Sequence, residues 1–60
     1  MKHYLFEIIG GEDEGEEFIV GADTLEEAQV IATEVADGAR GRFCCELTEF
    51  EAESSGLDEY

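Results

Sequence analysis

The sequence predicts an α+β fold in which three strands and one helix follow one another in the order β-β-α-β. Two strand-like stretches flank an acidic, glycine-containing turn within residues 2–21, a capped amphipathic segment follows, and a third alternating stretch runs from Arg42 to Leu47. Sixty residues with 43% hydrophobic content suit one small core. We therefore expect a single domain over residues 1–60.

Residues 2–9 have the pattern of a central strand. Tyr4, Phe6 and Ile8 alternate along one face, and the opposite face is also largely apolar, as expected for a strand with neighbours on both sides. Gly10-Gly11 ends the stretch, and residues 17–20 return as a second strand. The sequence therefore predicts a hairpin with a long acidic loop.

The next segment has clear helix signals. Thr24 and Glu27 have the spacing of a capping box, and Asp23 offers an alternative cap. Gly38 suits the left-handed position that ends a helix. Apolar side chains recur at helical spacing, at Leu25, Ala28, Ile31, Ala32 and Val35. The helix is expected over about residues 25–36.

The third strand is expected over residues 42–47, with its apolar side chains on one face. These are Phe43, Cys45 and Leu47. The alternation slips by one residue before Phe50, which predicts a bulge, kink or break near Thr48-Glu49. Beyond it, an extended chain would carry a ladder of carboxylates, from Glu49, Glu51 and Glu53.

The predicted sheet is antiparallel with strand order 2-1-3, because the helix returns the third strand to the side of the doubly apolar first strand. The helix covers one face, and the other face is left open or covered by a partner. The ordered core is expected over about residues 2–53. Ser54-Ser55-Gly56 marks its end, and residues 54–60 are expected to form a loose tail.

The charge balance restricts the classes of partner. Seventeen acidic residues face three basic ones, for a net charge of −14, which argues against direct contact with nucleic acid or an anionic membrane. No apolar segment approaches the roughly 20 residues that span a bilayer, and no signal-peptide pattern is present. Cys44 and Cys45 are adjacent and cannot pair normally with each other. We expect a soluble, reduced, cytoplasmic protein.

Neither metal binding nor catalysis is expected. The acidic turn lacks calcium-loop spacing, since the position six residues after Gly15 is Gly21 instead of a bidentate glutamate. His3, Cys44 and Cys45 have no paired zinc-ligand spacing. A chain this small, with few bases to activate a thiol, offers no evident catalytic pocket. We therefore expect no metal, no cofactor and no enzyme activity.

The carboxylates are the remaining candidates for function. Basic protein surfaces bind the regular phosphates of duplex DNA, and a rigid acidic surface can occupy the same site. Phe50 and Tyr60 are candidate apolar anchors beside the acids. The acids expected to bind a partner are Glu12, Asp13, Glu14, Glu16, Glu17, Glu46, Glu49, Glu51 and Glu53. The sequence thus predicts a DNA mimic that acts by competitive binding.

In size, charge and mixed α/β pattern, the whole chain resembles the small acidic inhibitors made by phages and other mobile elements. These include DNA-mimicking anti-CRISPR proteins and restriction inhibitors. The resemblance implies a steric inhibitor of a host defence effector, acting in the host cytoplasm if phage-encoded. Its partner would be a basic DNA-binding protein or a CRISPR effector subunit, bound at the surface that normally holds duplex DNA.

Two other interpretations remain open from the sequence. The chain can be a structural or assembly module that associates through its open sheet face, where Leu5 and Ile9 would matter most and the acids would serve solubility. The acids can also form a solvated surface, as in proteins adapted to high salt. Rising salt weakens electrostatic binding and strengthens apolar association, which separates the first two hypotheses. A homodimer is compatible with both.

Overall fold

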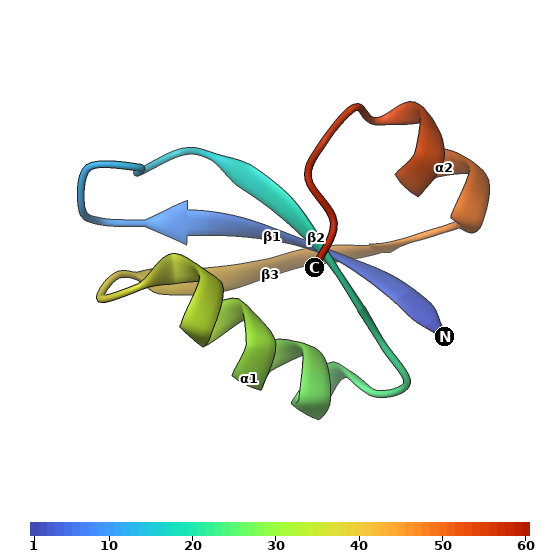
Figure 1. The fold of residues 1–60 in the computed structure, drawn as a ribbon, viewed down its shortest axis with the longest axis horizontal. Coiled ribbons are helices and arrows are strands. Elements are labelled where there is room, and N and C mark those ends of the chain that lie inside the picture. The colour runs from blue at the N-terminus through green and yellow to red at the C-terminus, as the bar shows by residue number, and fades with distance from the viewer.

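The computed structural model describes residues 1–60 and contains a three-stranded antiparallel sheet with two helices (Figure 1). The elements, in chain order, are β1 (Lys2–Ile9), β2 (Glu17–Ala22), α1 (Leu25–Ala36), β3 (Arg40–Leu47) and α2 (Glu49–Ser54). The strand order is β2-β1-β3, with both pairs antiparallel. The predicted α+β class, strand order and long helix are confirmed, and α2 is a second helix that the sequence prediction lacked.

The main core lies between α1 and one face of the sheet. Tyr4, Phe6 and Ile8 of β1 are buried there, and the ring of Phe6 stacks on Phe18 with centroids 5.8 Å apart. The helix contributes small buried side chains, which are Ala28, Ala32 and Ala36. A Cβ atom at Gly41 would lie 3.0 Å from Ala32 Cβ, so small residues on both elements set how closely α1 approaches β3.

The ends of α1 follow its sequence signals. Thr24 is the N-cap, and its Oγ1 accepts the Glu27 backbone N–H at 3.2 Å, so Thr24 caps the helix and Asp23 does not. At the other end, Asp37 (φ 42°) and Gly38 (φ 89°) both adopt positive φ. The predicted bounds of this helix are confirmed.

A bulge in β3 changes which side chains share a face. Leu5 pairs with Cys45 and Phe6 with Phe43, which leaves Cys44 as an extra residue on β3. Phe43 therefore contacts Phe6 on the α1 side, with ring centroids 6.0 Å apart, whereas Cys45 lies opposite Leu5 on the other side. The expectation that Phe43, Cys45 and Leu47 share one face is wrong, because the phase changes at Cys44.

The predicted break near Thr48-Glu49 is confirmed, but the chain beyond it is helical. Thr48 caps α2 in a full capping box: its Oγ1 accepts the Glu51 N–H at 3.1 Å, and Glu51 Oε1 accepts the Thr48 N–H at 2.9 Å. Ala52 is the buried residue of α2. The expected extended ladder of Glu49, Glu51 and Glu53 is therefore wrong, because the capping box begins a helix at this position.

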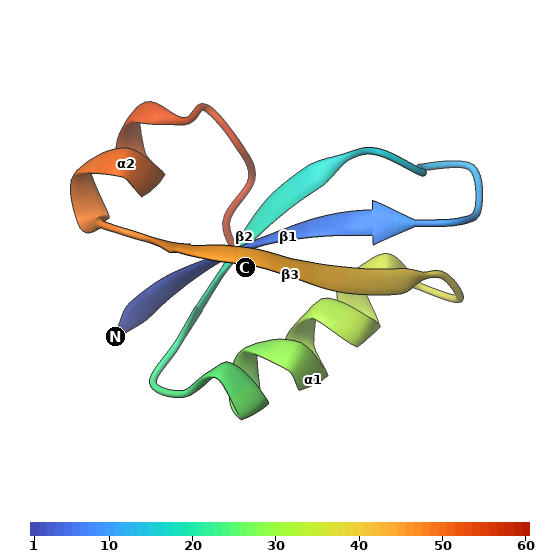
Figure 2. The same cartoon turned by 180° about the vertical axis from the view of Figure 1, so that it is seen from behind.

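The helices lie on opposite sides of the sheet, with α1 below it and α2 above it in Figures 1 and 2. The C-terminal segment then runs beside the outer edge of β2. The Ile19 N–H donates to Asp58 O at 2.9 Å, the Tyr60 N–H donates to Ile19 O at 2.8 Å, and the Gly21 N–H donates to Tyr60 O at 2.8 Å. The expectation of a loose tail over residues 54–60 is wrong, because the unpaired backbone groups of an edge strand offer it partners.

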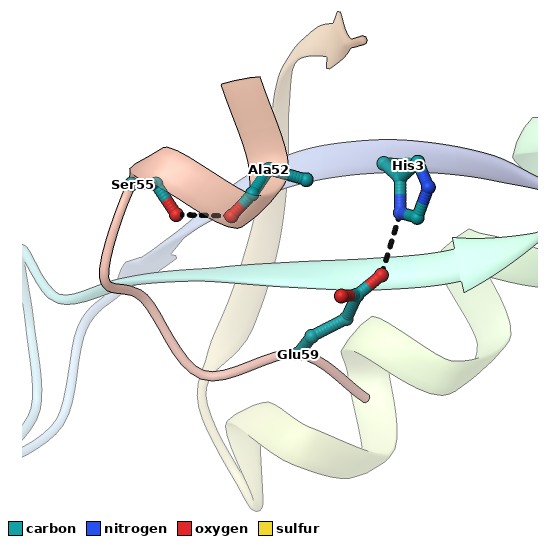
Figure 3. Close-up of polar contacts among 4 residues, drawn as sticks. All are labelled: His3, Ala52, Ser55 and Glu59. Carbon is teal, nitrogen blue, oxygen red and sulfur yellow. Dashed lines mark hydrogen bonds and ion pairs between the residues drawn. The ribbon is translucent and has the colours of Figure 1, made fainter. Parts of the chain in front are cut away.

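Side chains also attach this segment to the sheet (Figure 3). Glu59 Oε2 lies 2.6 Å from His3 Nδ1 of β1, while Ser55 Oγ donates to Ala52 O at 2.8 Å and so closes the end of α2. Gly21 pairs with His3, and a Cβ atom there would lie 2.8 Å from Met1 Sδ and 3.4 Å from Glu59 Oε2. The absence of a side chain at Gly21 thus leaves room chiefly for Met1, beside which Glu59 reaches across β2. The far face of the sheet, expected to be left open or covered by a partner, is covered in part by α2 and this segment of the same chain.

Candidate functional site

The nine acids predicted to bind a partner are all exposed, but eight of them form two separate groups. We call the first group the turn region; it consists of Glu12, Asp13, Glu14, Glu16 and Glu17. The second group, the α2 region, consists of Glu49, Glu51 and Glu53 with the predicted anchor Phe50. Glu46 lies apart from both groups, because it pairs with Tyr4 on the α1 side of the sheet. The hairpin turn and α2 lie at opposite ends of the molecule (Figure 1), whose longest dimension is 30 Å. The structure therefore does not gather the predicted acids into one surface.

The backbone of the turn region is fixed by hydrogen bonds to β1 and within the turn. The Ile8 N–H donates to Glu16 O, and the Gly15 N–H donates to Ile8 O, both at 2.8 Å. The Glu16 N–H donates to Asp13 O at 3.0 Å, and Gly15 has a φ of 91° that an L side chain rarely adopts. The carboxylates of the turn are thus carried on a defined loop.

The turn region and the C-terminal segment together form an open groove of about 340 Å³, which we call the edge groove. Its apolar lining consists of Ile8, Phe18, Val35 and Leu57, and its polar rim consists of Asp13, Glu16, Glu17, Asp58 and Tyr60. The predicted anchor Tyr60 lies here. No basic residue lines the groove. The sequence prediction missed Asp58 and the apolar lining, because both depend on the docking of the C-terminal segment.

The α2 region presents an aromatic ring among carboxylates. At about 100° per residue, Phe50 lies roughly opposite the buried Ala52, and it is 76% exposed. Glu49 and Glu53 are four residues apart and share one side of the helix. Glu51 is engaged with the Thr48 backbone. The predicted anchor Phe50 is therefore accessible, and Glu49 and Glu53 are the carboxylates of α2 that stay free for a partner.

The basic residues lie on the strands, Lys2 on β1 and Arg40 and Arg42 on β3. Arg42 bonds Glu7 across β1 and β3, and this hydrogen bond is the main cause that raises the pKa of Arg42. Glu7 also lies directly opposite Glu17 of β2, so Arg42 offsets repulsion between these two carboxylates. Arg42 thus supports the sheet, and no basic side chain forms an ion pair with an acid of the turn or of α2.

The residues capable of covalent or metal chemistry are dispersed. Cys44 is half-buried and Cys45 is exposed, both with free thiols. Burial raises the pKa of the Cys44 thiol more than nearby Arg42 lowers it, which disfavours the thiolate at neutral pH. The imidazole of His3 is in contact with Glu59, and no three His, Cys, Asp or Glu side chains are grouped as metal ligands. Neither helix has the length and apolar composition to cross a membrane.

Comparison with known proteins gives no relative: no family model, no curated protein and no solved structure matches this chain. Function is therefore inferred from the charge and geometry of the edge groove, the turn region and the α2 region.

Proposed function

We propose that the protein imitates the charge of DNA and occupies a basic DNA-binding surface of another protein, which it blocks sterically. The supporting observation is that exposed carboxylates on a fixed turn and a capped helix have no basic residue among them. Such a surface attracts a concave basic site and releases the same counterions that DNA releases on binding. The mechanism requires no chemical step and no cofactor.

The overall charge density supports this proposal. Duplex DNA carries one charge per roughly 1.7 Å of its axis, so a 30 Å length of duplex carries about 18 charges. The protein carries 17 acidic residues, for a net charge of −14, over the same length. The molecule is therefore close to duplex DNA in length per charge, although its acids concentrate at defined positions instead of following a helix.

The target class that we propose is a DNA-binding defence effector, such as a CRISPR effector complex. This part of the proposal is supported by the resemblance in size, charge and fold pattern to small acidic phage inhibitors. The alternative, assembly through the free sheet face, has little apolar surface to use. On that face Leu5 is half-buried and Ile19 is fully buried, so the large apolar side chains left exposed on the strand and at its start are Ile9 and Met1.

A competition experiment tests the proposal. Proteins retained on the immobilised chain from a bacterial lysate are eluted by a salt gradient, purified and assayed for duplex binding by fluorescence anisotropy. We expect the acidic chain to displace the duplex, with an affinity that falls as salt rises. A complex that holds DNA and the acidic chain together, or retention of no DNA-binding protein, contradicts the proposal.

Matched variants locate the contact. Glu49→Gln with Glu53→Gln removes two free carboxylates of the α2 region and keeps Glu51, whose loss would also break the α2 capping box. Glu26→Gln with Glu34→Gln removes two exposed carboxylates of α1 and serves as the control. We expect the α2 pair to weaken competition more than the control pair. Equal effects would show that net charge alone determines binding.

A further inference from the structure

We propose that the edge groove binds the side chain of an arginine supplied by the partner protein. This inference deepens the proposed function, because it names the group that one acidic region recognises. A groove of about 340 Å³ is at the small end of the range for ligand sites, roughly 300–1,000 Å³. That volume suits a single long side chain better than a larger ligand.

The lining of the groove matches the two parts of such a side chain. Ile8, Phe18 and Val35 supply apolar contact for the methylene stem, which basic side chains bury while their charged ends stay near polar groups. Tyr60 is 53% exposed at the rim, so part of its aromatic side chain is accessible to a cation.

Tyr60 is held through both its backbone and its ring. Its backbone N–H and C=O are both bonded to β2, at Ile19 and Gly21. Its ring packs edge-to-face on Phe18, with centroids 5.8 Å apart and planes at 87°. A ring that is held before the cation arrives loses little freedom on binding, which favours affinity.

The carboxylates of the rim form no ion pair within the chain. They come from the turn, from β2 and from the C-terminal segment. None of them takes part in the three ion pairs of the structure, which join the N-terminus to Asp23, His3 to Glu59 and Arg42 to Glu7. A cation in the groove would therefore be close to carboxylates that come from three segments of the chain and are free of ion pairs.

Arginine fits this lining better than lysine. The planar guanidinium binds carboxylates through two parallel hydrogen bonds, stacks on aromatic rings and is more weakly hydrated than an ammonium group. A lysine ammonium carries the same charge but cannot form the two parallel hydrogen bonds to one carboxylate. We therefore expect a preference for arginine of about twofold to fivefold, the size of an exposed cation–π contact.

An NMR titration of the full chain tests the inference. The probes are N-acetyl-arginine amide and N-acetyl-lysine amide, which differ only in the side chain. We expect the arginine probe to shift the backbone amides of Phe18, Val35 and Leu57 in a saturable way, while amides of α2 stay in place. Shifts spread evenly over all acidic segments, or equal affinity for the two probes, would overturn the inference.

Variants at the rim give the matched comparison. Asp58→Asn removes one rim carboxylate, whereas Glu26→Gln removes an exposed carboxylate at the start of α1. Only Asp58→Asn should weaken the arginine probe, and Tyr60→Leu should reduce the preference over lysine. Slow hydrogen exchange at the Ile19 and Gly21 amides shows that the C-terminal segment of each variant is still docked. Equal effects of Asp58→Asn and Glu26→Gln would refute the role of the rim.

The two proposals fail in different ways. If the arginine probe does not bind in the groove while the protein still displaces DNA from a basic partner, the groove assignment is wrong and DNA mimicry stands. If the probe binds the groove but no partner releases DNA, mimicry is wrong and the arginine site stands.

Discussion

Deleting Glu59 and Tyr60 tests whether the C-terminal segment is part of the sheet. The deletion removes two backbone hydrogen bonds to β2, the contact of Glu59 with His3 and the packing of Tyr60 on Phe18. It leaves the bond from the Ile19 N–H to Asp58 O as the one backbone link of the segment to β2. The change therefore affects the outer edge of β2 and, within the α1 core, the cover over Phe18.

The expected loss of stability is small, because two large contributions nearly cancel. Two backbone hydrogen bonds contribute about 2 kcal/mol, the aromatic pair about 1 kcal/mol, and the partly exposed His3–Glu59 pair under about 1 kcal/mol. Against this loss, the shortened chain no longer has to order the backbone of these two residues on folding, which saves about 2–4 kcal/mol of conformational entropy. Cover over the fully buried Ile19 is also reduced. We expect the free energy of unfolding to fall by about 1 kcal/mol, which lowers the melting temperature by roughly 4–8 °C in a domain of this size.

Amide hydrogen exchange gives the sharper measurement. The Ile19 and Gly21 N–H groups donate to the C-terminal segment, whereas the N–H of the intervening Val20 points towards β1 because successive residues of a strand alternate. The deletion should speed exchange at Gly21 most, and at Ile19 as the rest of the segment frays, while Val20 stays protected. A full-length variant with Glu59→Gln and Tyr60→Leu keeps the backbone bonds and should keep both amides protected. If Gly21 exchanges as slowly after the deletion as before it, the docked segment is not its partner.

Two further predictions concern β3. Gly41→Val should lower the free energy of unfolding by about 1–3 kcal/mol in a urea titration, because the new side chain meets Ala32 at the closest approach of α1; unchanged stability would contradict the packing. In a Cys45→Ser background, alkylation of Cys44 should reach its half-maximal rate at higher pH in the folded chain than in concentrated urea, since burial raises the pKa of Cys44. The same difference stabilises the fold below the unfolded-state pKa and is lost as pH rises through the folded-state pKa; a lower midpoint in the folded chain would refute this assignment.

The elements predicted correctly have signals confined to a few neighbouring residues. Gly10-Gly11 ends the first strand, and the pair Thr24 and Glu27 begins α1 where it was expected. The strand order followed from the apolar character of both faces of residues 2–9, which favoured a central place. Each of these inferences needs only side-chain spacing and the conformational preferences of glycine and of capping residues.

The two missed elements show where such inference fails. Thr48 and Glu51 have the same spacing as Thr24 and Glu27, so a local signal for α2 was present. A helix of six residues is too short for its periodicity to be distinguished from alternation along a strand. Docking of the C-terminal segment has no local signal, because it pairs residues about 40 positions apart and depends on an unpaired sheet edge.

The exposure of the candidate acids could be predicted from the sequence, but their grouping could not. The grouping determines how basic residues must be arranged on a partner. The turn region and the α2 region lie at opposite ends of a molecule 30 Å long, and the Debye length at physiological salt is about 8 Å. Carboxylates within one region therefore repel one another far more than the two regions do, which limits the cost of a net charge of −14. For the same reason, a basic surface shorter than the molecule gains attraction from one end only. A partner that binds both the turn region and the α2 region must carry two basic areas separated by a less charged span. In our proposal, an arginine of the area that faces the turn region would enter the edge groove.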